Sequence, residues 1–232
     1  MALIDIVKGA AIQVGLSPPV AASGQDRTTI ELVYWANYAS RELAQWHDWT
    51  ALATEGSFTG DDVTTAWPTP ADFDRMAKRN RIQRENDACY RLIGPLSGDQ
   101  RTDWNARGPV QINEVFWFRG GKIVINPALG MGRKVLFEYQ SRFLAATAAG
   151  ASKLEMVADD DVSRLDEECV KLGLVWRWLR QKRLDYMQER EDWRQRAELL
   201  AGRDQSIQPI AAGIMDQYDV PDLLIPDTIR VA

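Results

Sequence analysis

Residues 163–203, SRLDEECVKLGLVWRWLRQKRLDYMQEREDWRQRAELLAGR, carry the strongest helical pattern in the chain. Apolar residues recur there at alternating intervals of four and three, which places them on one face of a helix. These residues are Leu165, Cys169, Leu172, Trp176, Leu179, Tyr186, Trp193, Ala197 and Leu200. Arg183 and Arg190 fill the two missing positions, so one long helix and two helices with a break near Arg183 both fit the pattern. Gly202 is a candidate C-cap at its end.

Leu174 and Trp178 form a second apolar stripe on the first half of this stretch. A helix that is apolar on two faces packs on two sides, which a lone surface helix does not need. We therefore expect Trp176, Leu179 and Trp193 to support a helical body or its contacts with other subunits.

Two further helices are expected near the N-terminus. Residues 2–14 show helical spacing of Leu3, Ile6, Val7, Ala10 and Val14. The next helical pattern runs to about Asp48, and Thr28 with Glu31 forms a possible capping box at its start. These helices would pack with the helical region of residues 163–203.

Residues 50–147 are divided by Gly, Pro and Asp clusters into short apolar runs, which is typical of β-structure. Residues 115–118 and 122–126 flank Gly120-Gly121, and this arrangement predicts a hairpin. Residues 135–139 follow with alternate side chains on one side. We therefore expect at least three strands in an antiparallel meander.

The C-terminal residues 204–232 carry prolines that remove backbone donors and block a long helix. The segment therefore reads as an extended arm whose apolar side chains must be buried against another surface, because an extended chain alone cannot offset its ordering entropy. The expected partner-binding residues are Ile207, Ile210, Ile214, Met215, Tyr218, Val220, Leu223, Leu224, Ile225 and Ile229.

The predicted fold class is α+β, mainly α, with three parts. Residues 1–49 and 150–203 form a helical bundle body, residues 50–149 an inserted antiparallel β-rich subdomain, and residues 204–232 an extended C-terminal docking arm.

Net charge, cysteine count and the absence of long apolar runs limit the classes of protein to which the chain can belong. The 28 basic and 33 acidic residues give a net charge of −5, which argues against a protein whose main role is to grip nucleic acid. Cys89 and Cys169 lack metal-ligand spacing and are too few for a disulfide framework, so we expect packed, reduced thiols. The sequence shows no signal peptide pattern and no membrane span, which predicts a soluble protein made in the cytoplasm.

Candidate catalytic residues are sparse. His47 is the only histidine, and with Asp48 and Asp72 it could suggest a general base, but no nucleophile motif accompanies it. A hydrolase using Asp72, Asp74 or Glu138 would need two carboxylates that converge in a cleft, and no spacing here requires such a pair. We expect no catalytic activity and no cofactor.

Two motifs could bind ions. Asp159, Asp160 and Asp161 with Asp166 could hold a divalent cation, but without the spacing of a calcium loop an acidic helix N-terminus is favoured, and no metal is expected. The glycines of residues 130–132 lack a following lysine and threonine, so they indicate a turn between strands and not a phosphate-binding loop.

Aromatic and basic residues alternate in the run Trp176, Arg177, Trp178, Arg180, Lys182 and Arg183. This could be a nucleic-acid surface, but on a helix these residues do not share a face, and the cationic heads can reach acidic partners instead. Six further tryptophans could line a carbohydrate-binding groove, but their positions at element ends and in helical stripes favour a core and interfaces. They are Trp35, Trp46, Trp49, Trp67, Trp104 and Trp117.

The succession of short motifs resembles the head-to-tail adaptor (connector, or neck) proteins of tailed bacteriophages. The motifs are His47-Asp48-Trp49-Thr50, Trp67-Pro68-Thr69-Pro70-Ala71-Asp72-Phe73-Asp74-Arg75, Gly94-Pro95-Leu96-Ser97, Thr102-Asp103-Trp104, Phe118-Arg119-Gly120-Gly121-Lys122-Ile123 and Asn126-Pro127. The resemblance continues through Phe137-Glu138-Tyr139, the acidic residues 159–161, Leu172-Gly173-Leu174-Val175-Trp176-Arg177 and the helix to Asp204. Each motif alone is weak, and the specificity lies in their order.

This resemblance implies a helical bundle with a β insertion, of which about twelve copies form a ring in the virion neck. The implied partners are the portal protein and a tail or nozzle protein, and DNA would pass through the lumen without specific binding. The alternatives are a phage-associated tryptophan-rich ligand-binding module, which would expose an aromatic surface on the β region, and a hydrolase.

Overall fold

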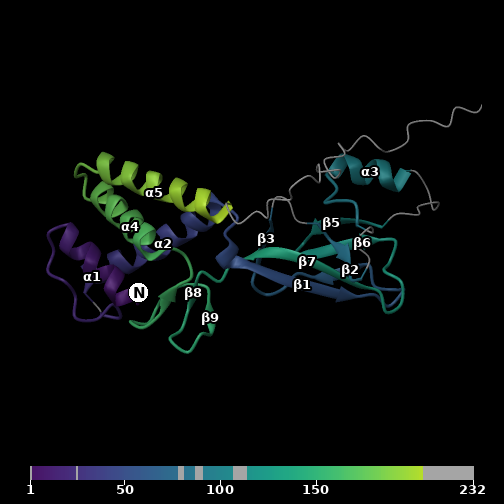
Figure 1. Cartoon of the computed structure of the whole chain (residues 1–232), viewed down its shortest axis with the longest axis horizontal. Helices are drawn as coiled ribbons and strands as arrows, with labels where there is room; N and C mark the ends of the chain where they lie inside the picture. Colours follow the sequence, from purple (N-terminus) through teal and green to yellow (C-terminus); the bar gives the residue numbers. More distant parts are fainter. Residues whose placement is uncertain (1, 25, 78–80, 87–90, 107–113, 206–232) are drawn as a thin grey trace, which may run out of the picture.

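The computed structural model describes residues 2–24, 26–77, 81–86, 91–106 and 114–205. The fold is mixed α+β, with helices and antiparallel sheets. Four helices gather at one end of the long axis, which we call the helical end, and the larger sheets lie at the other, the sheet end (Figure 1). The short helix α3 (Gly98–Ala106) lies at the sheet end.

The helical end contains α1 (Leu3–Gln13), α2 (Arg27–Trp46), α4 (Glu167–Gln181) and α5 (Met187–Gln205). Helix α4 contacts all three of the others. The predicted packing of α4 on two sides is therefore confirmed, and both residues of its second stripe, Leu174 and Trp178, are buried. Among the described residues, no helix combines the length and the apolar character needed to cross a membrane.

The helical stretch that was ambiguous in the sequence is two helices. Arg183 has a φ of 59°, in the left-handed region, and a residue in this conformation cannot continue a right-handed helix. The predicted C-cap at Gly202 is wrong, because α5 continues past it. The carboxylate of Asp204 accepts hydrogen bonds from the backbone N–H (2.9 Å) and hydroxyl (2.5 Å) of Thr50, so a tertiary contact holds the last turn.

The predicted capping box of α2 is also wrong. Helix α2 begins earlier, and its N-cap is Asp26, whose carboxylate accepts a hydrogen bond from the backbone N–H of Thr29 at 3.2 Å. Glu31 instead forms ion pairs with Arg27 and Lys182. An aspartate at the N-cap satisfies an otherwise unpaired donor of the first turn, so the helix starts where this cap is available.

Helices α2 and α4 approach closely at Gly173. A Cβ atom placed on this glycine would lie 2.8 Å from the Cβ of Ala39 and 3.0 Å from Nε1 of Trp193. Two small residues at a crossing allow two helix backbones to come together, so Gly173 sets the spacing of three helices at one point.

The predicted hairpin is confirmed. Strand β5 (Val115–Arg119) pairs antiparallel with β6 (Lys122–Asn126) around Gly120 and Gly121, both of which have positive φ. Strand β2 (Ala66–Pro68) pairs with the other edge of β6. These three strands form one sheet in the order β2-β6-β5.

The predicted meander is wrong, because the next strand belongs to a different sheet. Strand β7 (Lys134–Ser141) pairs with β1 (Ala53–Thr59), β3 (Phe73–Met76) and β4 (Gln83–Arg84). The ring of Phe137 lies over Gly56, where an added Cβ would be 2.4 Å from a ring carbon. Strand β7 pairs with β1 along all seven residues of β1, and Phe137 packs over Gly56. The edge of the short β5–β6 hairpin would give β7 fewer backbone and side-chain contacts.

The described residues bury two separate apolar clusters. One lies among the sheets and contains Phe58, Ile82, Leu92, Phe116, Ile123, Ile125, Leu129, Val135, Phe137 and Tyr139. The predicted common side of residues 135, 137 and 139 is thus confirmed. The other cluster fills the helical end.

A small third sheet of β8 (Ala145–Ala146), β9 (Ser152–Lys153) and β10 (Val162–Ser163) lies beside the helices (Figure 1). Leu144 and Ala145 are buried with the helices. These residues therefore belong to the helical end and not to the β-rich insertion predicted for residues 50–149.

Arg75 of β3 connects the two ends. Its guanidinium donates hydrogen bonds to the carboxylate of Asp48 (3.0 and 3.2 Å) and to the backbone carbonyls of Ala44 and His47 at the end of α2. Because the planar guanidinium of Arg75 donates several hydrogen bonds to the C-terminal end of α2, it fixes the direction of β3 as well as its distance from the helix. The sheet end is therefore oriented relative to α2.

Candidate functional site

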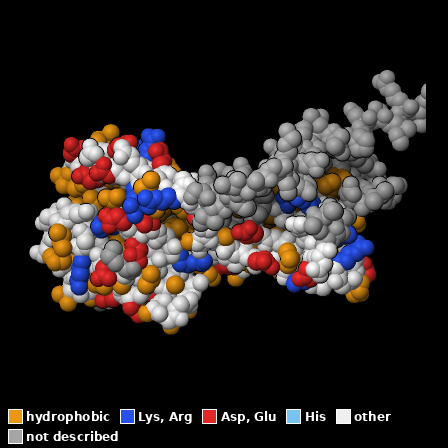
Figure 2. All heavy atoms as spheres, in the orientation of Figure 1, with side chains coloured by type: hydrophobic (Ala, Val, Ile, Leu, Met, Phe, Trp, Pro, Cys, Tyr) orange, Lys and Arg blue, Asp and Glu red, His pale blue; other side chains and the backbone are white. Residues whose placement is uncertain are grey.

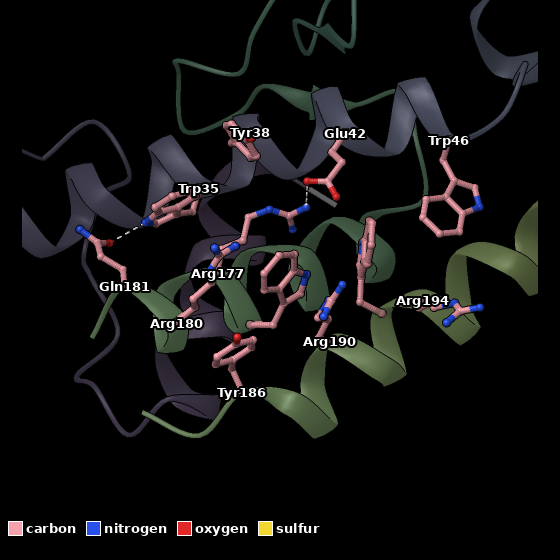
Figure 3. A pocket seen from close by; sticks show the side chains of 12 residues that line it. Trp35, Tyr38, Glu42, Trp46, Arg177, Arg180, Gln181, Tyr186, Arg190 and Arg194 are labelled. Atoms are coloured by element: carbon pink, nitrogen blue, oxygen red, sulfur yellow. Dashed lines mark hydrogen bonds and ion pairs between the residues drawn. The ribbon is translucent and has the colours of Figure 1, made fainter. Parts of the chain in front are cut away.

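The candidate site is a groove of about 960 Å³ between α2, α4 and α5 (Figure 3). Helix α2 contributes Trp35, Tyr38, Glu42 and Trp46. Intervals of three and four residues place these side chains on one side of the helix, next to the stripe of apolar residues that faces the core.

The other walls of the groove come from the stretch that forms α4 and α5. Helix α4 supplies Trp176, Arg177, Arg180 and Gln181, and the turn and first half of α5 supply Tyr186, Arg190, Trp193 and Arg194. The lining therefore contains four arginines, one glutamate and several aromatic rings. Its local charge is positive, in contrast to the net charge of −5 of the whole chain.

Arg177 lies at the base of the groove and is only 3% exposed. Its guanidinium forms an ion pair with Glu42 and donates a hydrogen bond to the backbone carbonyl of Gly173 at 2.5 Å. The guanidinium carbon lies 4.1 Å from the ring centroid of Trp176 and 5.1 Å from that of Trp193. Burial lowers the pKa of Arg177, and the bond to Glu42 opposes this shift, so the guanidinium stays charged.

Trp176 and Trp193 are buried against the helical core, as the sequence predicted. The ring of Trp193 lies 6.0 Å from that of Trp176 and makes an edge contact with Trp46 at 5.4 Å. Leu179 is partly buried and packs against the same core. Their predicted role in subunit contacts stays a prediction.

Several donors in the groove have no partner among the described residues. Nε1 of Trp176, Nε1 of Trp193 and Nε of Arg177 are buried without a hydrogen bond to any described group. Arg180 and Arg190 are exposed, and neither forms an ion pair with a described residue. The buried donors are out of reach of a ligand, but the two exposed guanidinium groups favour one that carries carboxylates.

The tryptophan and arginine run does not form a single nucleic-acid surface. Arg177 and Arg180 face the groove, whereas Trp178 is buried elsewhere and lies 5.4 Å from the Lys182 ammonium. Lys182 in turn reaches Glu31 at 2.6 Å. The expectation that these cations reach acidic partners is confirmed for Arg177 and Lys182.

The residues proposed as a general base are not brought together. Nε2 of His47 lies 3.5 Å from the Asp204 carboxylate, which also binds Thr50. Asp48 instead binds Arg75. This part of the chain links the end of α5 to the connection between α2 and β1.

Asp72 has a structural environment in the sheet end. Its carboxylate accepts hydrogen bonds from the hydroxyls of Tyr139 (2.7 Å) and Ser141 (2.9 Å). Burial opposes ionisation of Asp72, but these bonds outweigh it and lower the pKa of its carboxyl. Burial and the Asp72 carboxylate both raise the pKa of Tyr139. A stable carboxylate held by two hydroxyls fixes a loop onto β7.

The carboxylates considered for a hydrolase have different surroundings. Asp74 forms an ion pair with Arg75. Glu138 is exposed and lies on the opposite face of β7 from Tyr139. Asp72 is hydrogen-bonded to Tyr139.

The acidic run is not a helix N-terminus, contrary to expectation. The Asp161 side chain is 1% exposed, and its carboxylate binds the Lys153 ammonium (2.7 and 2.9 Å) and the backbone N–H groups of Val157 and Ala158. The carboxylate of Asp159 accepts a hydrogen bond from the backbone of Ser23. The described residues contain no group of three or more potential ligands placed to hold a metal ion.

Asp166 alone acts as the cap of α4. Its carboxylate accepts a hydrogen bond from the backbone N–H of Cys169 at 2.8 Å and pairs with Arg196 of α5. Cys169 is buried, and this burial together with the Asp166 charge raises its pKa to about 12. The predicted packed thiol is confirmed for Cys169, while Cys89 lies outside the described residues.

The glycine turn, the C-terminal arm and the groove have different outcomes. Residues 130–132 form a turn between β6 and β7, as predicted. The partner-binding residues expected in the C-terminal arm, from Ile207 to Ile229, all lie outside the described residues. The groove itself was not predicted, because its arginines lie on two helices whose alignment depends on how α5 packs against α4.

The chain matches no protein-family model, and the comparison with curated proteins also gave no match.

Proposed function

We propose that this chain is a structural head-to-tail adaptor of a tailed bacteriophage, located in the neck of the virion. Copies of the chain would form a homo-oligomeric ring of about twelve subunits between the portal and the tail or nozzle protein. The helical end would act as the bundle-like body of the ring, and the sheets as its inserted subdomain.

The observation that supports this proposal most is the arrangement of two separate apolar cores along one long axis (Figure 1). A chain whose two ends are stabilised independently can present different surfaces to different neighbours at each end. Arg75, which fixes the sheets to the end of α2, would transmit a defined orientation from one neighbour to the other.

The surface chemistry agrees with a ring through which DNA passes without specific binding. The visible face of the helical end mixes acidic, basic and apolar side chains (Figure 2). A mixed surface on a chain of net charge −5 gives little of the continuous positive field that nucleic-acid binding requires.

The experiment that tests the proposal is electron microscopy of the purified full-length chain, alone and mixed with the portal and tail proteins of the same phage. A closed ring that joins the portal to the tail is expected. A chain that stays monomeric with both proteins, or that binds neither, would contradict the adaptor function.

Residues 204–232 provide a second test. Among the described residues, the buried cluster of the helical end runs to Ala197, with Leu200 and Ala201 packed against it, so a chain that ends at Asp204 is expected to keep its circular dichroism and solubility. It should fail to join the head to the tail, because its docking arm is missing. Normal assembly of infectious particles from the shortened chain would show that the arm is not a docking element.

A further inference from the structure

We propose that, in the free protein, the groove between α2, α4 and α5 binds residues 216–225 of the same chain, DQYDVPDLLI. This inference concerns the isolated chain and does not rest on a place in the virion. The groove would hold the C-terminal segment on its own subunit until another surface takes it.

Charge complementarity favours this occupant. The segment contains Asp216, Asp219 and Asp222 and no basic residue. The groove is lined by four arginines and one glutamate, and its exposed Arg180 and Arg190 have no ion-pair partner among the described residues. Carboxylates spaced by three residues can reach such cations from one strand of chain, and each contact is a charge-assisted hydrogen bond.

The apolar chemistry also matches. Between its carboxylates the segment carries Tyr218, Val220 and the apolar residues 223–225. In the groove, the side chains of Tyr38 and Trp46 are 41% and 39% exposed, so apolar surface remains open to a ligand.

The length of the chain allows the segment to reach its own groove. Asp204 is bonded to Thr50, so α5 ends at a defined place. From Gln205 back to Arg194 the helix rises about 16 Å at 1.5 Å per residue. Residues 206–215 can span up to about 33 Å. A tethered segment therefore meets the groove at a high effective concentration, which favours the same chain over a second copy in dilute solution.

Single-stranded nucleic acid fits the groove less well. Base stacking needs an open aromatic face, and Trp176 and Trp193 offer none, because both are buried and the Arg177 guanidinium lies over their rings. Stacking would depend on more exposed rings such as Tyr38 and Trp46. The groove also contains the carboxylate of Glu42, which would repel a phosphate backbone.

Photocrosslinking of the full-length chain tests the proposal. The substitution Tyr218→p-benzoylphenylalanine places a crosslinker in the segment, and irradiation of a dilute sample is followed by peptide mapping. Adducts within one chain are expected on α2 between Tyr38 and Trp46, and between Tyr186 and Arg194 in the turn and first half of α5. Added synthetic peptide of residues 216–225 should lower the yield of these adducts by competition.

Charge variants supply the controls. Reversal of both free arginines, Arg180→Glu with Arg190→Glu, should lower the groove adducts by about tenfold, since two favourable charge contacts become repulsive. Adding Asp219→Arg with Asp222→Arg should restore the adducts by exchanging the charges. The matched control, Arg119→Glu with Arg142→Glu, changes the net charge equally on exposed residues of the sheet end and should leave the yield unchanged.

Three results would overturn the proposal. They are adducts that join two chains, adducts that fall mainly on the sheet end, and a yield that is insensitive to the arginine reversal. Binding of a short single-stranded DNA to the wild-type groove at physiological salt, lost in the arginine variant, would assign the groove to nucleic acid instead. The crosslink forms in the isolated protein, so a failure of ring assembly would not affect its outcome.

Discussion

The substitution Trp193→Ala should destabilise the helical end more than any change to its exposed aromatic residues. Trp193 is 3% exposed, and its ring contacts those of Trp176 and Trp46 and the Arg177 guanidinium. Truncation of a buried tryptophan costs about 3–5 kcal/mol, and these additional ring contacts place this one near 4 kcal/mol. At about 2–4 °C per kcal/mol for a chain of this size, the melting temperature should fall by about 8–16 °C.

Thermal unfolding followed by far-UV circular dichroism measures this loss, because the helical end contributes most of the helical signal. Trp46→Ala is the matched control, since Trp46 lines the same groove and contacts the same ring but is 39% exposed. It should cost about 1–2 kcal/mol, mainly from one aromatic pair and partial burial. Equal losses in the two variants, or no loss in Trp193→Ala, would show that Trp193 is not buried in the helical core.

Three further changes test other parts of the structure. Gly173→Ala would place a Cβ 2.8 Å from that of Ala39, so α2 and α4 must separate, and urea unfolding should show a loss of about 1–3 kcal/mol. Glu42→Gln removes the carboxylate that pairs with buried Arg177. Because Glu42 itself is partly exposed, the free energy of unfolding in urea should fall by only about 1–2 kcal/mol. An unchanged urea midpoint would contradict the pairing. Burial opposes ionisation of Asp161, but a lysine and two backbone N–H groups hold its pKa below the ordinary 3.8. Its contribution is therefore present above that value and is lost as the pH falls through the folded pKa, so Asp161→Asn should flatten the loss of stability on acidification, measured as melting temperature against pH.

The sequence by itself determined those features that depend on local periodicity and turn chemistry. The intervals of three and four predicted α1, the existence of a helix at α2 and the burial of Trp176 and Trp193. A glycine pair between two apolar runs predicted the β5–β6 hairpin. These features need only neighbouring residues, because the side chains that share a helix face or a strand face are set by the backbone geometry.

Only the tertiary structure decided the partner of β7 and the existence of the groove. Strand β7 presents the same apolar alternation to either sheet, and its place beside β1 depends on the fit of Phe137 over Gly56, a contact between residues far apart in the chain. The turn at Arg183 folds α5 back along α4, and this packing brings Arg190 beside Arg177 and Glu42. Local propensity does not encode how two helices align, since that alignment is selected by the close packing of their contacting side chains.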